Sequence, residues 1–294
     1  MTSTIKLTRS DRVFHIFIDA ALALILALLI IPIWSTLTLS FQPNDFIGSA
    51  LDGMILPPWK WSTAAYKALL GHRSFLSAAG NSFRIFFEGV ITALFFTVPL
   101  AYALSIKTLP GRKLLYGIVL VPYLFNPGLV PNYLLVTKMG LTNTLAAVFL
   151  PGAVSVYNTL IMKSFFEELP EELKESARID GASELTVLLK IILPLSKPIL
   201  LTIGLYYGVH FWNDFFNAML YINDAKLQPL PILLRNILLS SGMNEYVEAN
   251  AFGEAPIYAI KAASVFLAAI PMLVAYPFIQ SYFVKGTMLG SIKG

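Results

Sequence analysis

The sequence contains no cysteine, few histidines and no phosphate-binding loop, and each absence excludes a class of chemistry. Without cysteine the chain can form no disulfide, no thiolate metal site and no cysteine nucleophile. The three histidines, His15, His72 and His210, lie too far apart in the sequence to suggest a metal-binding motif. The pattern G-x-x-x-x-G-K-S/T, whose backbone amides cradle nucleotide phosphates, occurs nowhere. We therefore predict no bound metal or cofactor, and any use of ATP and magnesium must belong to another polypeptide.

Charged residues are also scarce. They make up 13% of the 294 residues, whereas 56% are hydrophobic, and the mean hydropathy is +0.70. Soluble domains carry about a quarter charged residues, so this balance favours a membrane protein. The net charge of +4 is modest and is more typical of basic cytoplasmic loops than of nucleic-acid binding.

Six segments are apolar over the length that crosses a bilayer, which is about 20 residues. They are Phe14–Ser40, Ala79–Ile106, Leu114–Val136, Thr144–Phe166, Pro194–Ile222 and Ile257–Val284. The first is too long for a signal peptide and lacks a small-residue cleavage site, so it should remain in the mature protein. We predict an all-α membrane protein with six transmembrane helices. One transmembrane domain covers residues 14–284, between terminal segments 1–13 and 285–294.

Basic residues predict the orientation of these helices. With the N-terminus inside, thirteen Lys and Arg residues fall in cytoplasmic segments and six in outer loops. An excess of Lys and Arg marks the cytoplasmic side of a membrane protein. Both termini are therefore predicted to be cytoplasmic.

Two predicted outer loops are long enough to fold. The first, 41–78, contains Trp59, Trp61 and Tyr66, which either form an aromatic belt at the membrane interface or a docking surface for an extracytoplasmic partner. The second, 223–256, contains the apolar run Leu227–Leu239, which prolines and Arg235 interrupt. That run is too short and broken to span, so we place it on the outer surface.

The cytoplasmic loop 167–193 is predicted to fold as a helix, a turn and a second short helix. Pro170 suits a helix start, and the helix should stop at Asp180-Gly181, since glycine favours the left-handed turn past a helix end. Asp180 could cap a second helix over Ala182–Leu188. On the first helix, one stripe is apolar and the opposite side is charged. The apolar stripe is Leu169, Leu173 and Ala177; the charged side is Glu167, Glu171, Lys174, Glu175 and Arg178.

The same loop carries a recognisable motif. Its residues are Glu175-Ser176-Ala177-Arg178-Ile179-Asp180-Gly181-Ala182, followed by Ile191, Leu193-Pro194 and Pro198. The string resembles the EAA loop of binding-protein-dependent ABC importers, with Ser176 in place of the usual alanine. The resemblance implies a coupling helix that inserts into a groove of a separate ATPase. A surface helix that merely connects two spans is the competing interpretation.

The resemblance extends along nearly the whole chain to the LplC-like branch of carbohydrate importer permeases. It rests on Leu109–Lys113, Asn126–Val136, Leu150–Ala153, Trp212-Asn213, Leu230–Ile237 and Tyr282–Gly290. It implies a subunit of the bacterial cytoplasmic membrane that is not itself an enzyme. The implied partners are a second, different permease, an ATPase dimer and an extracytoplasmic sugar-binding protein. The implied cargo is an oligosaccharide, such as a fragment of alginate or pectin.

Polar residues in the fifth predicted span are candidates for a substrate pathway. If the span were one continuous helix, its polar residues would share a face. They are Tyr206, His210, Asn213, Asp214 and Asn217, with Trp212 beside them. A charge at the bilayer centre costs about 2.5–3.5 kcal/mol on insertion scales, so Asp214 should face protein or water. These groups suit sugar hydroxyls and rings; the alternative is a hydrogen-bond network between helices, which we favour for Tyr206.

The third predicted span is interrupted by Pro122, Pro127, Gly128 and Pro131. Non-helical backbone at membrane depth persists only where it lines a cavity or is covered by protein. Asn126, Asn132 and Tyr133 therefore become pathway candidates, with a plain proline kink as the alternative. Arg84 and Glu88, four residues apart, are expected to form a structural ion pair.

Three rival functions remain. An ion-driven secondary transporter predicts internal repeats or an intramembrane carboxylate relay, whereas Asp214 is the one acid expected to be buried in the spans, and no repeat is visible. An intramembrane enzyme predicts paired carboxylates or a nucleophile beside a base, and no such arrangement is visible. An ABC permease for a non-sugar solute is compatible with the loop motif, and only the wider resemblance argues against it.

Overall fold

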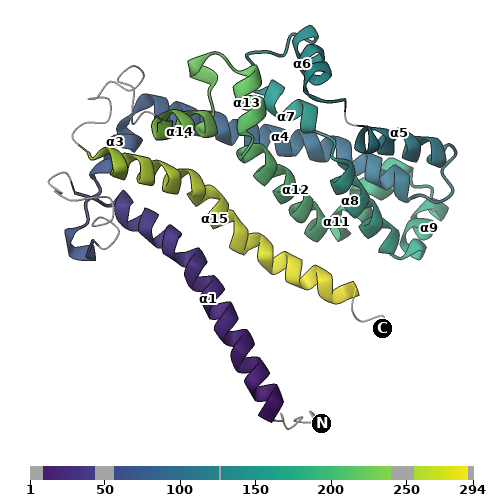
Figure 1. Ribbon diagram of the computed structural model, residues 1–294. Helices are drawn as coiled ribbons and strands as arrows, with labels where there is room; N and C mark the ends of the chain where they lie inside the picture. The colour runs from purple at the N-terminus through teal and green to yellow at the C-terminus, as the bar shows by residue number, and fades with distance from the viewer. Residues whose placement is uncertain (1–8, 44–55, 126, 240–254, 291–294) are drawn as a thin grey trace. The chain divides into compact units, whose positions relative to one another are not determined.

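The computed structural model describes residues 9–43, 56–125, 127–239 and 255–290, and every regular element in these ranges is a helix (Figure 1). The described chain forms two compact units. The first contains the residues up to His72 together with Ile237–Leu267, and the second contains Arg73–Asn236 together with the residues from Ala268 onward. The helical content agrees with the all-α class predicted from the apolar segments.

The first unit contains α1 (Arg9–Ser40), the 3-10 turn η1 (Pro58–Lys60), α3 (Ala64–Gly71) and the start of α15 (Ile257–Gly290). Trp61 stacks on Phe41 at 4.7 Å between ring centroids, and Tyr66 lies 5.0 Å from the same ring. Trp59 is exposed. Two of the three loop aromatics therefore pack against the end of α1, and only Trp59 is presented outward.

The second unit is built around α4 (Arg73–Ser105), against which α8 (Val156–Glu168) and α12 (Lys197–Trp212) pack (Figure 1). The other elements that begin in this unit are shorter. They are α5 (Arg112–Leu124), α6 (Leu129–Lys138), α7 (Ala146–Phe149), η2 (Leu150–Gly152), α9 (Glu171–Ile179), α10 (Glu184–Val187), the π-helical turn η3 (Leu188–Ile192), α11 (Leu193–Leu195), α13 (Phe215–Tyr221), η4 (Ala225–Leu227) and α14 (Leu230–Leu239).

Three helices are long and apolar enough to cross a membrane by themselves. These spans are Phe14–Ser40, Arg73–Ser105 and Ile257–Ala275. Three bent pairs qualify only when their two parts are taken together, which raises the number to six among the described residues. The pairs are α5 with α6, α7–η2 with α8, and Glu184–Leu195 with α12. The chain is thus a multi-pass membrane protein in which half of the predicted spans are broken.

The break in the third span is at the predicted place. Helix α5 continues through Pro122 and ends at Leu124, and α6 begins after Gly128. Gly128 has φ of 83°, a backbone conformation that glycine adopts readily and other residues rarely adopt. Pro131 is in the first turn of α6, where a missing N–H is tolerated. The interruption therefore comes from the residues around Gly128, and Pro122 does not end its helix.

The fourth span contains a break that the hydropathy pattern did not predict. Its two parts meet at 53°, between η2 and α8. Ser155 has extended backbone, and its hydroxyl accepts a hydrogen bond from the Asn158 N–H, so it caps the start of α8. The Ser155 N–H donates to the Tyr207 hydroxyl at 2.9 Å. Every polar group that the break exposes at this residue therefore has a partner.

The fifth span was predicted as one helix over Pro194–Ile222, and that prediction is wrong. Helix α12 ends at Trp212 and α13 begins at Phe215, with Asp214 as the cap of α13. The shared helical face expected for Tyr206 to Asn217 therefore does not exist. The physical reason is local, since an Asp carboxylate that accepts the N–H three residues on competes with the continued helix.

The α4–α12 contact is close because glycines lie in it. A Cβ on Gly89 of α4 would come within 2.6 Å of the Phe211 ring and 3.0 Å of the Phe149 Cβ. A Cβ on Gly208 of α12 would clash with the Phe86 ring. Small residues that let helices approach are the usual means of packing in membranes, where lipid provides no hydrophobic driving force.

Tyr207 joins three helices in this packed region. Its buried hydroxyl shares a 2.7 Å hydrogen bond with Thr97 of α4 while it accepts from the Ser155 N–H. We expect Tyr207→Phe to lower the free energy of unfolding by about 1–2 kcal/mol, because the Ser155 N–H and the Thr97 hydroxyl lose their partner. Thermal unfolding in detergent measures the change. Tyr206→Phe, at the neighbouring and more exposed tyrosine, is the control and should leave the midpoint unchanged.

Candidate functional site

The loop between α8 and α12 folds as two short helices joined by a tight turn. Helix α9 begins after Pro170, with Glu171 and Glu172 in its first turn, where negative charge is favourable. It ends at Ile179, and Gly181 has φ of 79°. The Ala182 N–H donates to the Ala177 carbonyl at 2.9 Å and closes the turn. The predicted stop at Asp180-Gly181 is therefore confirmed.

The cap of the second helix differs from the prediction. Ser183, rather than Asp180, precedes α10, and its hydroxyl accepts from the Thr186 N–H. A capping residue needs extended backbone, which Ser183 has at ψ of 156° and Asp180, at ψ of 8°, lacks. The second helix is also shorter than predicted, because the chain passes from Val187 into the π-helical turn η3.

The buried face of α9 is centred on Lys174 and Ala177 rather than on Leu173. Leu173 is 41% exposed, whereas Lys174 is only 3% exposed. The Lys174 ammonium donates to the Phe166 carbonyl at 3.3 Å and to Glu171 at 3.0 Å. A lysine can bury its aliphatic stem when its charged end has partners. The predicted apolar stripe was wrong at these two positions, because it treated lysine as a surface residue.

Arg178 and Glu184 link the two helices of the loop. The Arg178 Nε donates to Glu184 Oε1 at 2.7 Å, and its Nη1 lies 3.4 Å from Glu171. Glu184 Oε2 accepts from the Tyr102 hydroxyl of α4 at 2.7 Å. The hydrogen bond from Lys174 lowers the pKa of Glu171. The Glu171 carboxylate is therefore ionised near neutral pH.

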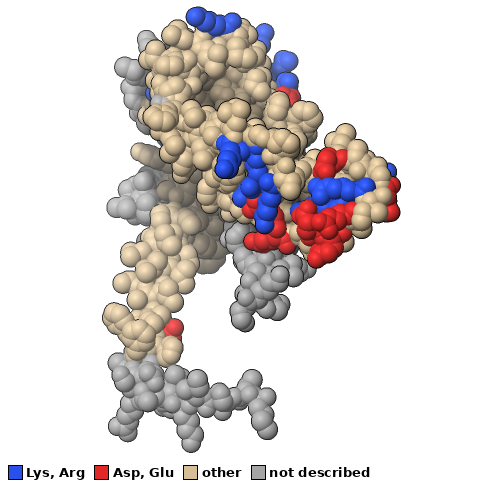
Figure 2. Space-filling model, turned by 90° about the vertical axis from the view of Figure 1, so that its right-hand side faces the viewer, with Lys and Arg blue, Asp and Glu red and all other residues tan. Residues whose placement is uncertain are grey.

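A second ion-pair cluster lies beside the loop, at the end of α8. Glu167 accepts from Arg112 of α5 at 2.8 Å and pairs with Lys163 at 2.6 Å. Both cations also lie against the Tyr116 ring, at 5.9 and 5.5 Å from its centroid. Figure 2 shows acidic and basic side chains gathered next to one another on one face of the molecule.

The motif residues divide into buried and exposed groups. Ala177 is buried, Arg178 and Ala182 are half-buried, and Leu193 is half-buried in α11. The exposed group consists of Glu175, Ser176, Asp180, Gly181 and Pro194. Ile179 is 85% exposed although it is apolar. The turn therefore presents a surface of small, acidic and apolar groups to solvent. The ion pairs of Arg178 with Glu171 and Glu184 stabilise the loop that carries this surface.

A cavity of about 350 Å³ opens beside this surface. It lies between the residues after α4, the end of α8 and the first turns of α9. Its lining contains three glutamates and two lysines, and Glu175 is the one glutamate of the three to which no ion pair is assigned. The residues around it are Ser105, Ile106, Lys107, Thr108, Glu167, Leu169, Glu171, Lys174 and Glu175.

Among the pathway candidates, Asp214 and Asn217 are brought together. Asp214 Oδ1 accepts from the Asn217 N–H at 3.0 Å, and its Oδ2 accepts from the Asn217 side-chain amide at 2.7 Å. Asn213 is exposed, and its side-chain amide donates to the Val209 carbonyl at 2.9 Å. His210 is exposed near the end of α12. These polar groups surround the break between α12 and α13.

The other candidates have different surroundings. Trp212 is only 4% exposed, and its indole N–H donates to the Ala268 carbonyl at 3.1 Å. Tyr133 of α6 stacks on Tyr221 of α13 at 6.1 Å, and Asn132 is exposed. Asn126 lies outside the described residues. The expected Arg84–Glu88 pair is present at 3.2 Å on the surface of α4.

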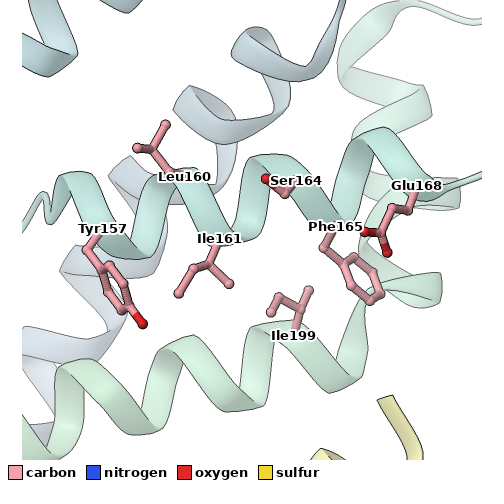
Figure 3. Close-up of a pocket in the computed structure, with 7 residues that line it drawn as sticks. All are labelled: Tyr157, Leu160, Ile161, Ser164, Phe165, Glu168 and Ile199. Atoms are coloured by element: carbon pink, nitrogen blue, oxygen red, sulfur yellow. The ribbon is translucent and has the colours of Figure 1, made fainter. Parts of the chain in front are cut away.

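A groove of about 440 Å³ runs between α8 and α12 (Figure 3). Ile161 and Phe165 of α8 point toward Ile199 of α12 across it. Its remaining lining is Tyr157, Leu160, Ser164 and Glu168. This mainly apolar lining suits an acyl chain or an apolar helix better than a polar solute.

Sequence reasoning missed three residues that organise these regions: Tyr102, Glu184 and Tyr207. Their partners are distant in the sequence, and no local pattern pairs α4 with α10 or α12. The cap residues Ser155 and Asp214 did carry a signal. Ser and Asp are residue types preferred at the start of a helix, and each accepts the N–H three residues later.

Three apolar spans, or up to six if each bent pair is one span, together with an exposed helix–turn–helix loop, mark the described chain as a multi-pass membrane protein. Residues 6–288 match the family described as "Binding-protein-dependent transport system inner membrane component". The chain belongs to this family, whose members are permease subunits of ABC transporters.

Individual relatives match along the full length. The chain is 39% identical to the protein LplC of Bacillus subtilis (strain 168), over 99% of this chain and 98% of that one. It is 36% identical to the Bacillus subtilis polygalacturonan/rhamnogalacturonan transport system permease protein YtcP, over 97% and 99%. A crystal structure of a bacterial ABC transporter involved in the import of the acidic polysaccharide alginate has a chain of the same fold. The TM-score is 0.87 and the identity 29%, over 95% of this chain and all of that one.

Proposed function

We propose that this chain is one permease subunit of an ABC importer that moves an oligosaccharide into the cell. An extracytoplasmic binding protein delivers the sugar, a second, non-identical permease completes the pathway, and a separate ATPase dimer supplies the energy. The observation that carries the proposal is the α9–turn–α10 loop. In it, an EAA-like sequence forms an exposed turn, and the Arg178–Glu184 ion pair connects the two helices on either side of the turn.

The names of the relatives support a carbohydrate cargo. YtcP is a polygalacturonan/rhamnogalacturonan permease, and the structural relative belongs to an importer of alginate, an acidic polysaccharide. A further relative, 30% identical over 73% of this chain, is the arabinooligosaccharide permease AraQ of Halalkalibacterium halodurans. Because the structural relative is involved in the import of an acidic polysaccharide, an acidic oligosaccharide is the first substrate class to test.

The loop acts in this proposal as the coupling element between ATPase and spans. Glu175 presents a carboxylate to a basic or amide group of the ATPase, and Ala177, Gly181 and Ala182 allow close approach. ATP binding closes the ATPase dimer, and the docked loop then biases the spans between inward and outward openings. This places the loop and both termini on the cytoplasmic side, as the distribution of Lys and Arg predicts.

The polar residues at the broken spans are proposed to line the pathway. Asp214, Asn217, Asn213 and His210 offer hydrogen-bonding groups beside the α12–α13 break. Tyr133, which is exposed and stacks on the buried Tyr221, offers an aromatic ring of the kind on which sugars pack. Asn126 and Asn132 belong to the same proposal through the break before α6, and Trp212 contributes by holding α12 in place.

Co-purification tests the coupling role directly. The wild-type chain, expressed with its partner permease and ATPase, should retain the ATPase, and Glu175→Arg should lose most of it because the charge at the contact is reversed. Glu172→Arg, an exposed glutamate at the start of the same helix, is the matched control and should retain the ATPase. Retention by Glu175→Arg at the wild-type level contradicts the proposed docking surface.

Reconstitution separates the cargo classes. In vesicles that contain both permeases, the ATPase and the binding protein, an acidic oligosaccharide should stimulate ATP hydrolysis. Stimulation by a non-sugar solute alone would assign the importer to another cargo. Uptake without any ATPase, driven by an ion gradient, would instead indicate a secondary transporter.

A further inference from the structure

The coupling loop is hydrogen-bonded to α4 through the Glu184 carboxylate. Glu184 of α10 accepts the Tyr102 hydroxyl at 2.7 Å through Oε2 and the Arg178 Nε at 2.7 Å through Oε1. Arg178 Nη2 lies a further 3.4 Å from Oε2. Glu184 therefore contacts the last turns of α4, the end of α9 and, through its own backbone, the start of α10.

The apolar side of the loop packs against the same helices. Ala177, Val187 and Leu188 belong to one buried cluster with Tyr102 of α4 and Phe166 of α8. Tyr102 lies edge-on to Phe166 at 6.4 Å between centroids. Apolar packing of this kind is non-directional, so it holds the loop against α4 and α8 without fixing its rotation. The hydrogen bonds that join Tyr102, Glu184 and Arg178 are directional, so they fix the orientation of the loop relative to α4.

The contact connects the exposed loop to a buried residue of α4. Glu175, Ser176, Ile179 and Glu184 are exposed, whereas Tyr102 is 5% exposed. A movement of the turn is passed on to the transmembrane helices only by side chains that keep their orientation while the loop moves. A charged residue with two short hydrogen bonds to different helices resists rotation more than apolar contacts do.

We infer that Glu184, held by Tyr102 and Arg178, is a positioning residue that makes the coupling loop move as one body with α4. The inference rests on the proposed function of the loop. It assigns to Tyr102 and Glu184, neither of which is part of the exposed turn, the transmission of movement rather than the binding of the ATPase.

Tyr102→Phe is the sharpest test, because it removes one hydroxyl and leaves the Arg178–Glu184 pair intact. In the reconstituted transporter, Tyr102→Phe should lower the number of substrate molecules imported per ATP hydrolysed by about three- to tenfold, as expected for one lost hydrogen bond. ATPase co-purification should stay at the wild-type level. Tyr123→Phe, an exposed tyrosine of α5, is the matched control and should change neither quantity.

A double-mutant cycle identifies the contact. Glu184→Gln should lower the same ratio, and Tyr102→Phe combined with Glu184→Gln should be no worse than the more damaging single variant, because both remove one shared contact. Additive losses overturn the inference. So does an unchanged ratio in Tyr102→Phe, or a loss of ATPase binding together with a lower unfolding temperature, which would make the contact structural only. Failure of the wild-type chain to bind any ATPase would instead overturn the proposed function itself.

Discussion

Replacing Gly181 by proline should abolish substrate uptake while the protein remains in the membrane. Gly181 has φ of 79°, and proline is restricted to about −65°. The Gly181 N–H also donates to the Arg178 carbonyl at 3.0 Å, and proline has no N–H to donate. The turn would reopen, and α10 could no longer bring Glu184 to Arg178. Because the site lies in a loop outside the long spans, membrane insertion should be unaffected.

Gly181→Ala is the matched control for the proline variant. No atom lies within 4 Å of a Cβ built on Gly181, so alanine meets no steric obstacle and adds only the strain of a left-handed backbone, about 1–2 kcal/mol. We expect alanine to retain part of the uptake and proline to retain none. Uptake and the amount of ATPase bound should be measured on the same preparations. Wild-type uptake by the proline variant would contradict a coupling role for the turn.

The sequence predicts the elements whose causes are local. Gly181 marks the end of α9, because only glycine adopts its backbone conformation without strain. The three long helices follow from apolar length, since a helix satisfies all of its own backbone hydrogen bonds within lipid. The break before α6 follows from Gly128 and the prolines around it.

The wrong predictions arise where a single residue, such as a helix cap, acts against the average hydropathy or average exposure expected for its surroundings. Hydropathy over a window of about 20 residues treats Thr144–Phe166 as continuous, although Ser155 caps a new helix within it. The same average conceals the cap at Asp214. Lys174 was placed on the charged side of α9 because a lysine is rarely buried, whereas the Phe166 carbonyl and Glu171 satisfy its ammonium.

Contacts between residues that are far apart in the sequence could not be predicted from any pattern in it. Tyr102 and Glu184 meet only because α4 ends beside the loop that α8 and α12 enclose. Tyr207 meets Ser155 only because the fourth span is broken at that residue. Both contacts depend on the packed arrangement of several helices, and a single sequence contains no signal that pairs them.

Replacing Asp214 by asparagine should lower the maximal rate of uptake by about tenfold with only a small fall in the unfolding temperature. Asparagine keeps an oxygen that can accept the Asn217 N–H, so the start of α13 stays capped. It loses the negative charge, and hydrogen bonds to charged groups contribute about 1.5–3 kcal/mol. If Asp214 accepts sugar hydroxyls, the loss should appear in transport. Uptake of labelled oligosaccharide into vesicles measures it.

Two further variants separate a pathway role from a capping role at Asp214. Asp214→Ala removes the cap as well as the charge, so it should lower both uptake and the unfolding temperature. Asp224→Asn is the matched control, because Asp224 also caps a helical turn, through the Lys226 N–H at 2.9 Å, but is exposed at η4. It should leave uptake unchanged. Normal uptake in Asp214→Asn, together with a destabilised Asp214→Ala, would mean that Asp214 only begins α13. Reduced uptake in a stable Asp214→Asn variant would place its carboxylate on the sugar's route, at the point where the fifth span is broken.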